Sequence, residues 1–243
     1  MQEYLVVLAL AALPAAGNFA GGLLAEFVPL SDRRLSFALH AAAGIVLAVV
    51  GIELMGQVLL AEPPWVALLA FVAGGGVAVA LDTLVDLVRG RFGGKAQDTG
   101  AWMIYFGVAV DLFSDGLLVG TGSTLSISLG LLLALGQVPA DVPEGFATIA
   151  TFRKLGVPRR RRILLAASFA LPILIAASLG YWVVRQAPDI YKLSLLALTA
   201  GILVTVAVEE MVTQAHATED TRWDTLALVG GFALFALISV YFE

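Results

Sequence analysis

Apolar segments long enough to cross a lipid bilayer follow one another along nearly the whole chain. A membrane-spanning helix needs about 20 mostly apolar residues. Eight segments meet this need, at 4–27, 35–60, 65–88, 101–121, 125–151, 163–184, 193–215 and 224–242. Their apolar runs are continuous, whereas the strands of a membrane β-barrel alternate apolar and polar residues. The sequence therefore predicts an all-α integral membrane protein with eight transmembrane helices, in which residues 1–243 form a single membrane domain.

The basic residues are unevenly distributed between the two sides of this predicted bundle. Of the 14 Lys and Arg residues, 12 fall between spans 1 and 2, 3 and 4, 5 and 6, or 7 and 8, which leaves Arg185 and Lys192. Cytoplasmic loops of membrane proteins are enriched in Lys and Arg. We therefore expect both termini to be extracytoplasmic, in a plasma membrane or an inner membrane. We also expect the run Arg159 to Arg162 to anchor the topology on anionic lipid.

Composition disfavours several classes of function. Only 14% of the residues are charged and the mean hydropathy is +0.93, whereas about a quarter of a soluble domain is charged. The net charge of −5 argues against nucleic-acid binding. The chain contains no Walker A loop, dinucleotide glycine motif or His-Glu-x-x-His motif, so we expect neither a prosthetic cofactor nor enzyme activity. Because cysteine is absent, a metal site must use Asp, Glu, His or amide ligands.

Acidic residues lie inside the predicted spans, where no Lys or Arg lies deep enough to neutralise them. A carboxylate near the middle of a membrane costs at least about 2.5 kcal/mol. Any single acid can be explained as a protonated hydrogen-bond donor between helices, but the whole set cannot. The set must be protonated, hydrated in a cavity, or neutralised by a bound cation. These acids are Glu53, Asp82, Asp111, Asp115, Asp141, Glu144, Glu209 and Glu210.

Four of these acids form two closely spaced pairs on consecutive spans. Asp111 and Asp115 are four residues apart in span 4, and Asp141 and Glu144 are three residues apart in span 5. Residues at either spacing share one face of a helix. Two such pairs can converge on one cation, and oxygen ligands suit divalent ions such as Mg²⁺, Mn²⁺ or Fe²⁺.

Three sequence motifs resemble those of the ZIP (Zrt/Irt-like) metal-ion transporter family. The segment Ala140-Asp141-Val142-Pro143-Glu144-Gly145 resembles the family's span-5 motif, His/Gln-Asn/Asp-x-Pro-Glu-Gly. The segment Asp111 to Gly116 resembles a degenerate form of the span-4 motif, His-Asn-x-Pro-Glu-Gly. The segment Val208 to His216 resembles the span-7 motif, His/Glu-Glu-x-x-Pro-Glu-Ser-His. The number of spans and the motif order also match, so the resemblance covers the whole chain.

The resemblance implies a ligand set and a local helix break. The metal ligands would be Asp111, Asp115, Asp141 and Glu144, with Glu209, Glu210 and His216 near the inner exit. Separately from the resemblance, Glu53 lies in the outer part of span 2, where its charge would attract the ion from outside. Pro143 would break the span-5 helix and free a backbone carbonyl near the site. Three ligand positions depart from the motifs, because Asp111 replaces the span-4 His, Asp115 replaces the span-4 Glu and Ala140 occupies the first span-5 position. Without imidazole, we expect a preference for cations harder than Zn²⁺.

We therefore expect a transporter of divalent metal ions (Mn²⁺, Fe²⁺, Zn²⁺ or a similar ion), embedded in lipid and associating as a homodimer if it follows the family. The resemblance implies alternating access by movement of one group of helices. A proton-linked carrier for another solute, a membrane-embedded metal-dependent hydrolase and a metal-binding homologue without transport activity stay open. Among other polar residues, we expect Asn18 to bond a neighbouring helix, and Gln57 and Gln137 to be hydrated rim residues.

Overall fold

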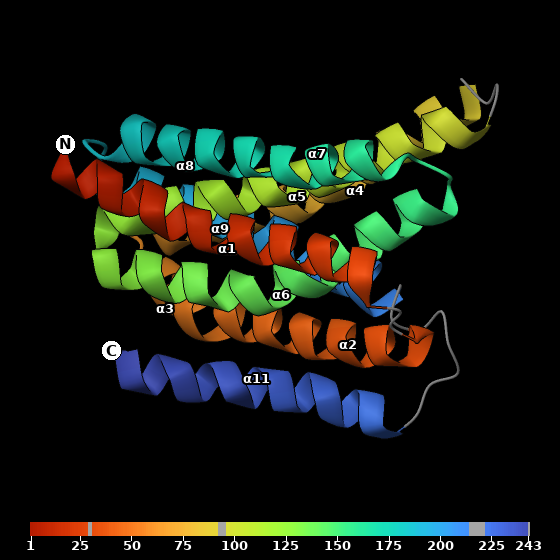
Figure 1. Ribbon diagram of the computed structural model, residues 1–243. Coiled ribbons are helices and arrows are strands. Elements are labelled where there is room, and N and C mark those ends of the chain that lie inside the picture. The colour runs from red at the N-terminus through yellow and green to blue at the C-terminus, as the bar shows by residue number, and fades with distance from the viewer. Residues whose placement is uncertain (29–30, 92–95, 214–221, 243) are drawn as a thin grey trace.

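The computed structural model describes residues 1–28, 31–91, 96–213 and 222–242, and these residues form helices and short connections with no strand (Figure 1). Two segments, η1 and η2, are π-helices, which are wider than α-helices and are found frequently at functional sites. The helices are α1 (Gln2–Phe27), α2 (Asp32–Ala48), η1 (Val49–Leu54), α3 (Met55–Val58), α4 (Pro64–Arg91), α5 (Ala96–Leu125), α6 (Ile127–Lys154), α7 (Arg159–Ser168), α8 (Ala170–Val184), α9 (Asp189–Thr205), η2 (Val206–Val212) and α11 (Arg222–Phe242).

Over the described residues, the helices make eight passes along one bundle, since α2–η1–α3, α7–α8 and α9–η2 each make a single pass. Seven passes are long and apolar enough to span a membrane. The pass that falls short is α6, because Gln137, Asp141 and Glu144 interrupt its apolar run. The chain is thus an all-α integral membrane protein, as predicted. Both termini lie at the same end of the bundle (Figure 1).

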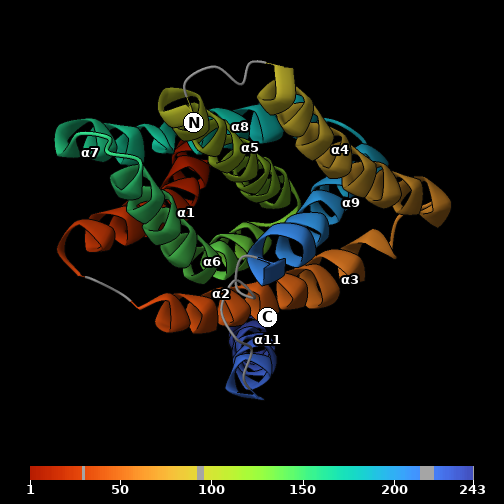
Figure 2. The ribbon, with the colours of Figure 1, turned by 90° about the vertical axis from the view of Figure 1, so that its right-hand side faces the viewer.

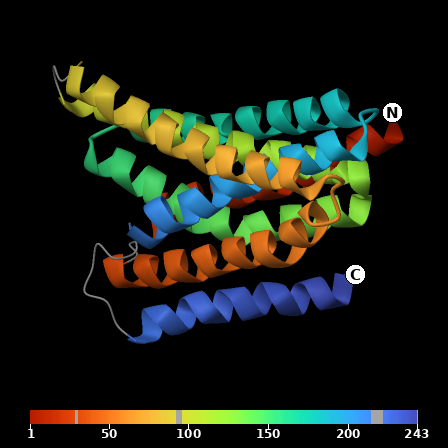
Figure 3. The ribbon, with the colours of Figure 1, turned by 180° about the vertical axis from the view of Figure 1, so that it is seen from behind.

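The passes divide into two groups of helices that contact one another along a shared interface. The first group, called here the α5–α6 group, contains α1, α5, α6 and α7–α8, with α1 packed on α6 and α5 on α8. The second, called here the α2–α9 group, contains α2–η1–α3, α4, α9–η2 and α11, with α4 packed on α9 and α11 on α2. Figure 2 shows α11 outside α2, and Figure 3 shows α4 beside α9 on the rear face. The interface between the groups is formed by α2 against α6 and α5 against α9.

A tight turn at Ser126 joins α5 to α6 and makes them antiparallel neighbours. Ser126 has extended backbone dihedrals, and its hydroxyl accepts a hydrogen bond of 3.0 Å from the Leu129 amide. This side-chain cap satisfies one of the free N–H groups at the start of α6. A connection of one residue fixes the register between the two helices that carry most of the predicted site residues.

The expected helix break at Pro143 does not occur, because α6 continues through both Pro139 and Pro143 to Lys154. Proline removes one backbone hydrogen bond, but transmembrane helices tolerate that loss where neighbouring helices pack against them. The support here comes from α1: a Cβ atom at Gly145 would overlap the backbone carbonyl oxygen of Asn18. This close approach packs α6 against α1 directly after Pro143.

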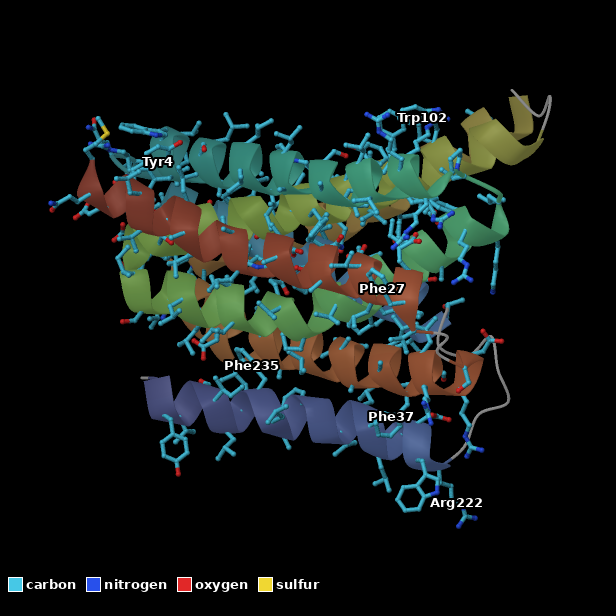
Figure 4. The ribbon with its side chains drawn as sticks, in the orientation of Figure 1. Tyr4, Phe27, Phe37, Trp102, Arg222 and Phe235 are labelled. Atoms are coloured by element: carbon cyan, nitrogen blue, oxygen red, sulfur yellow. The ribbon has the colours of Figure 1, made fainter. Side chains whose placement is uncertain are left out.

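A partly buried ion pair ties α1 to α7 at the end of the bundle opposite the termini. The Arg162 guanidinium donates to both carboxylate oxygens of Glu26, at 2.5 and 2.8 Å, and to the backbone oxygen of Val157 at 2.5 Å. Figure 4 shows Phe27, which follows Glu26, and Trp102 near this end and Tyr4 near the other. The run Arg159 to Arg162 was predicted to contact anionic lipid, but the Arg162 side chain instead binds Glu26 within the protein.

Candidate metal-ion site

The turn at Ser126 brings four polar residues of α5 and α6 into two layers. Asp115 lies eleven residues before Ser126 and Gln137 eleven residues after it, while Asp111 and Asp141 each lie fifteen residues away. In an antiparallel helix pair, residues equally far from a short connection lie at about the same depth. The hairpin therefore places Asp115 opposite Gln137, and places Asp111 opposite Asp141 one helical turn further from the connection.

These four side chains are buried and close together. Asp111 is 8% exposed, Asp115 and Asp141 are each 2% exposed, and Gln137 is 1% exposed. The amide Nε2 of Gln137 donates a hydrogen bond to Asp115 Oδ1. The carboxyl groups of Asp115 and Asp141 lie within hydrogen-bonding reach of each other, and Asp111 is near enough to both to interact electrostatically.

A small cavity separates these residues from the α2–α9 group. Its volume is about 10 Å³, which is roughly what one water molecule requires. One wall is polar and belongs to α5 and α6, whereas the opposite wall is apolar and belongs to α2, α9 and η2. Within the described part of the chain, no Lys or Arg lines the cavity. Its lining residues are Val46, Asp111, Asp115, Gln137, Ala140, Asp141, Leu203, Val206 and Met211.

Glu144, the fourth predicted ligand, lies one turn further along α6 but does not line this cavity. Its Oε2 accepts a hydrogen bond of 3.3 Å from Asn18 Nδ2 on α1, which confirms the expected bond from Asn18 to a neighbouring helix. Glu144 is still close enough to Asp141 to interact with it electrostatically. Asp141 thus lies between the cavity and the hydrogen bond that joins Glu144 to Asn18 of α1.

The remaining predicted residues are not gathered at the cavity. Glu53 is buried in η1 and accepts a hydrogen bond from the Ser239 hydroxyl of α11. The Glu209 side chain is exposed, although its segment η2 also contributes Val206 and Met211 to the apolar wall. His216 and the side chain of Glu210 lie outside what the structure describes.

Sequence reasoning assigned Gln137 to a hydrated rim, whereas the structure buries it in the cavity wall. A signal for this position is present in the sequence, because Gln137 and Asp141 are four residues apart and share a helix face. The predicted boundary between spans 4 and 5, at residues 121–125, lay a few residues before the real turn. With the turn placed too early, the sequence does not show that Gln137 and Asp115 lie at the same depth in the bundle.

The arrangement offers oxygen atoms to a cation. Gln137 Oε1 and Asp141 Oδ2 are buried and have no hydrogen-bond partner within the described structure. Buried polar atoms of native proteins are almost always paired, so two unpaired acceptors beside one cavity point to a ligand that accepts their lone pairs. Among the described residues, no three Asp, Glu, His or Cys side chains are grouped closely enough to hold a metal ion. Any cation site must therefore include a ligand of another type.

Comparison with known protein families shows what kind of protein carries this site. The family model described as "ZIP Zinc transporter" matches residues 91–239, which include α5, α6 and all four polar residues of the cavity. The match extends over more than half of the chain. The chain therefore belongs to the ZIP family, a family of membrane transporters and not of enzymes, as its motifs predicted.

Several curated relatives carry zinc in their names. The human zinc transporter ZIP6 is 26% identical over 151 residues, which are 58% of this chain and 20% of ZIP6. Human ZIP10 is 26% identical over 165 residues, covering 61% of this chain and 20% of ZIP10. Human ZIP4 is 27% identical over 150 residues, covering 58% of this chain and 22% of ZIP4. The matched region thus spans about a fifth of the length of each relative.

Proposed function

We propose that this chain transports divalent metal ions across the membrane through the cavity between the polar residues of α5 and α6 and the apolar wall of the α2–α9 group. The observation that carries the proposal is that three buried aspartates, Asp111, Asp115 and Asp141, line one cavity that no Lys or Arg of the described residues lines. Carboxylates in hydrocarbon require neutralisation, and a divalent cation supplies it. Membership of a transporter family and the names of the zinc-transporting relatives support the same function.

The distribution of polar and apolar residues supports a mechanism of alternating access. Every polar residue of the cavity belongs to the α5–α6 group, while the α2–α9 group contributes Val46, Leu203, Val206 and Met211. An apolar wall makes no directional bond with the ion, so the α5–α6 group can slide along it while keeping its ligands. Such a displacement would open the site to each side of the membrane in turn. Glu53 on the outer side, and Glu209, Glu210 and His216 on the inner side, are the proposed residues of entry and exit.

The test is uptake of Mn²⁺, Fe²⁺ and Zn²⁺ by purified protein in liposomes. Asp141→Asn and Asp115→Asn should each remove uptake, because each takes away one negative charge that offsets the charge of the ion. Asp189→Asn is the matched control, since Asp189 is exposed and pairs with Lys192 at 2.9 Å. Uptake by Asp141→Asn and Asp115→Asn equal to that of Asp189→Asn would refute the assigned site.

A second candidate function is a proton-linked carrier for another solute. The close carboxyl groups of Asp115 and Asp141 favour it, because two carboxyl groups within hydrogen-bonding reach can hold one proton between them. A carrier of this kind would move protons down a pH gradient in liposomes that contain no divalent cation. Metal transport predicts instead that proton movement requires the cation on one side of the membrane.

A further inference from the structure

Gln137 is the residue of the cavity that the family motifs do not account for. Its side chain is 1% exposed, and its Nε2 donates to Asp115 Oδ1. Its carbonyl oxygen Oε1 is buried and has no hydrogen-bond partner within the described structure. An unpaired buried oxygen destabilises the folded protein, whereas a leucine of similar size would have no such cost. The Gln137 amide nitrogen therefore has a hydrogen-bond partner in the protein, whereas its carbonyl oxygen has none. A carbonyl oxygen can act as a ligand for a cation.

The position of Gln137 on α6 allows its side chain to reach a cation in the cavity. The motif position that would hold a ligand is occupied by Ala140, which lines the cavity but carries no donor atom. Gln137 comes one turn earlier on the same face as Asp141, and it lies at the depth of Asp115 across the hairpin. A long side chain from the preceding turn thus reaches the space that the small Ala140 side chain leaves open.

The acids alone are too few for a cation site. Among the described residues, no three Asp, Glu, His or Cys side chains are close enough to hold a metal ion, whereas divalent cations with oxygen ligands take six or more donors, including amide carbonyls and water. An amide carbonyl adds a donor without adding a further negative charge to a site that already contains several carboxyl groups. A neutral oxygen ligand can therefore complete the cation site without increasing the repulsion between the carboxylates.

We infer that the Gln137 side-chain carbonyl is a direct ligand of the transported cation and that it directs the site toward ions that prefer oxygen over nitrogen ligands. This inference rests on the proposed function. The cation lies between Asp115, Asp141 and Gln137, with Gln137 Oε1 and Asp141 Oδ2 turned toward it. An all-oxygen site of this type discriminates less strongly in favour of Zn²⁺ over Mn²⁺ than a site with imidazole does, because imidazole suits Zn²⁺ whereas carboxylate, carbonyl and water ligands suit Mn²⁺.

The test exchanges the proposed ligand atom and measures the ratio of Mn²⁺ to Zn²⁺ uptake in liposomes. Gln137→Leu removes the oxygen, and we expect Mn²⁺ affinity to fall by roughly tenfold or more, since even indirect partners of metal ligands have effects of that size. Gln137→His places an imidazole there, and we expect the ratio to shift toward Zn²⁺ by at least about tenfold. Gln137→Glu keeps the oxygen, and we expect it to retain the ratio of Mn²⁺ to Zn²⁺ uptake of the unaltered protein. Gln57→His is the matched control, because Gln57 is a half-buried amide on α3 outside the cavity, and its ratio should equal that of the unaltered protein.

The outcomes separate this inference from the proposed function. If the unaltered protein takes up no divalent cation, or Asp141→Asn leaves uptake intact, the proposed function itself is wrong. If Asp141→Asn removes uptake but Gln137→His and Gln137→Leu keep the original ratio, the assignment of Gln137 as a ligand is overturned. An equal loss of both ions with an unchanged ratio also overturns it, because that result indicates a role limited to holding Asp115. Equilibrium binding of Mn²⁺ and Zn²⁺ to folded Gln137→His protein and to the unaltered protein measures the same shift in ratio without transport.

Discussion

Removal of either partner of the ion pair between Glu26 and Arg162 should strongly destabilise the α5–α6 group. Both side chains are nearly buried, with 3% of Glu26 and 11% of Arg162 exposed, and the contact is bidentate. Removing one partner of a buried pair costs about 3–5 kcal/mol, because the other charge stays in a medium that solvates it poorly. Glu26→Gln should therefore reduce the folding equilibrium constant by roughly a hundredfold or more. Arg159, whose side chain is 58% exposed and 3.5 Å from Glu26, should add little.

The assay is unfolding of the purified protein in mixed detergent, followed by tryptophan fluorescence. Glu26→Gln and Arg162→Met should each lower the free energy of unfolding, while the double variant should lose less than the sum, because no unpaired charge remains. Arg160→Gln is the control, since Arg160 is exposed and a surface change of this kind is usually worth less than about 0.5 kcal/mol. A loss in Glu26→Gln no larger than the loss in Arg160→Gln would refute the reasoning, because it would mean that water screens the pair.

Two further predictions concern transport and packing. Carboxylates must lose their protons to bind a metal, so uptake should fall as the pH is lowered, and a rising initial rate of Mn²⁺ uptake at acid pH would contradict metal binding by Asp115 and Asp141. Gly145→Val should separate α1 from α6, because its Cβ would overlap the Asn18 carbonyl; overpacking of this kind costs about 1–3 kcal/mol. Thermal unfolding in detergent measures that loss, and Gly51→Val, where a Cβ meets no atom within 4 Å, serves as its control.

Local chemistry explains why the membrane architecture was predictable. Long apolar segments must be helical in a bilayer, because an unpaired backbone amide has no water to bind there. An even number of passes also places both termini at one end, as Figure 1 shows. The apolar runs identified the bundle even for α6, whose polar residues make it the pass with the weakest membrane signal.

The expectations that failed depended on contacts between distant segments. The resemblance implied a helix break at Pro143, yet α6 is continuous there and packs closely on α1, where Gly145 meets the Asn18 carbonyl. Arg162 appeared equivalent to its three neighbouring arginines, yet it is the member of the run that reaches a buried carboxylate on α1 with a bidentate contact. Neither contact leaves a periodic pattern in the sequence, because each joins residues more than a hundred positions apart.

The sequence by itself determined that the chain is a helical membrane protein of the ZIP type with carboxylates inside its spans. Hydropathy, charge and short motifs are properties of single segments, so each was visible without the fold. Only the tertiary structure decided which polar residues meet, because a turn at Ser126 sets the register of α5 on α6. That register brings Gln137 beside Asp115 and Asp141, turns Glu144 toward Asn18, and places Glu53 against Ser239. The physical reason is that two side chains can form one site only if they lie at the same depth in the bundle and point toward each other. Both conditions are set by how the helices pack.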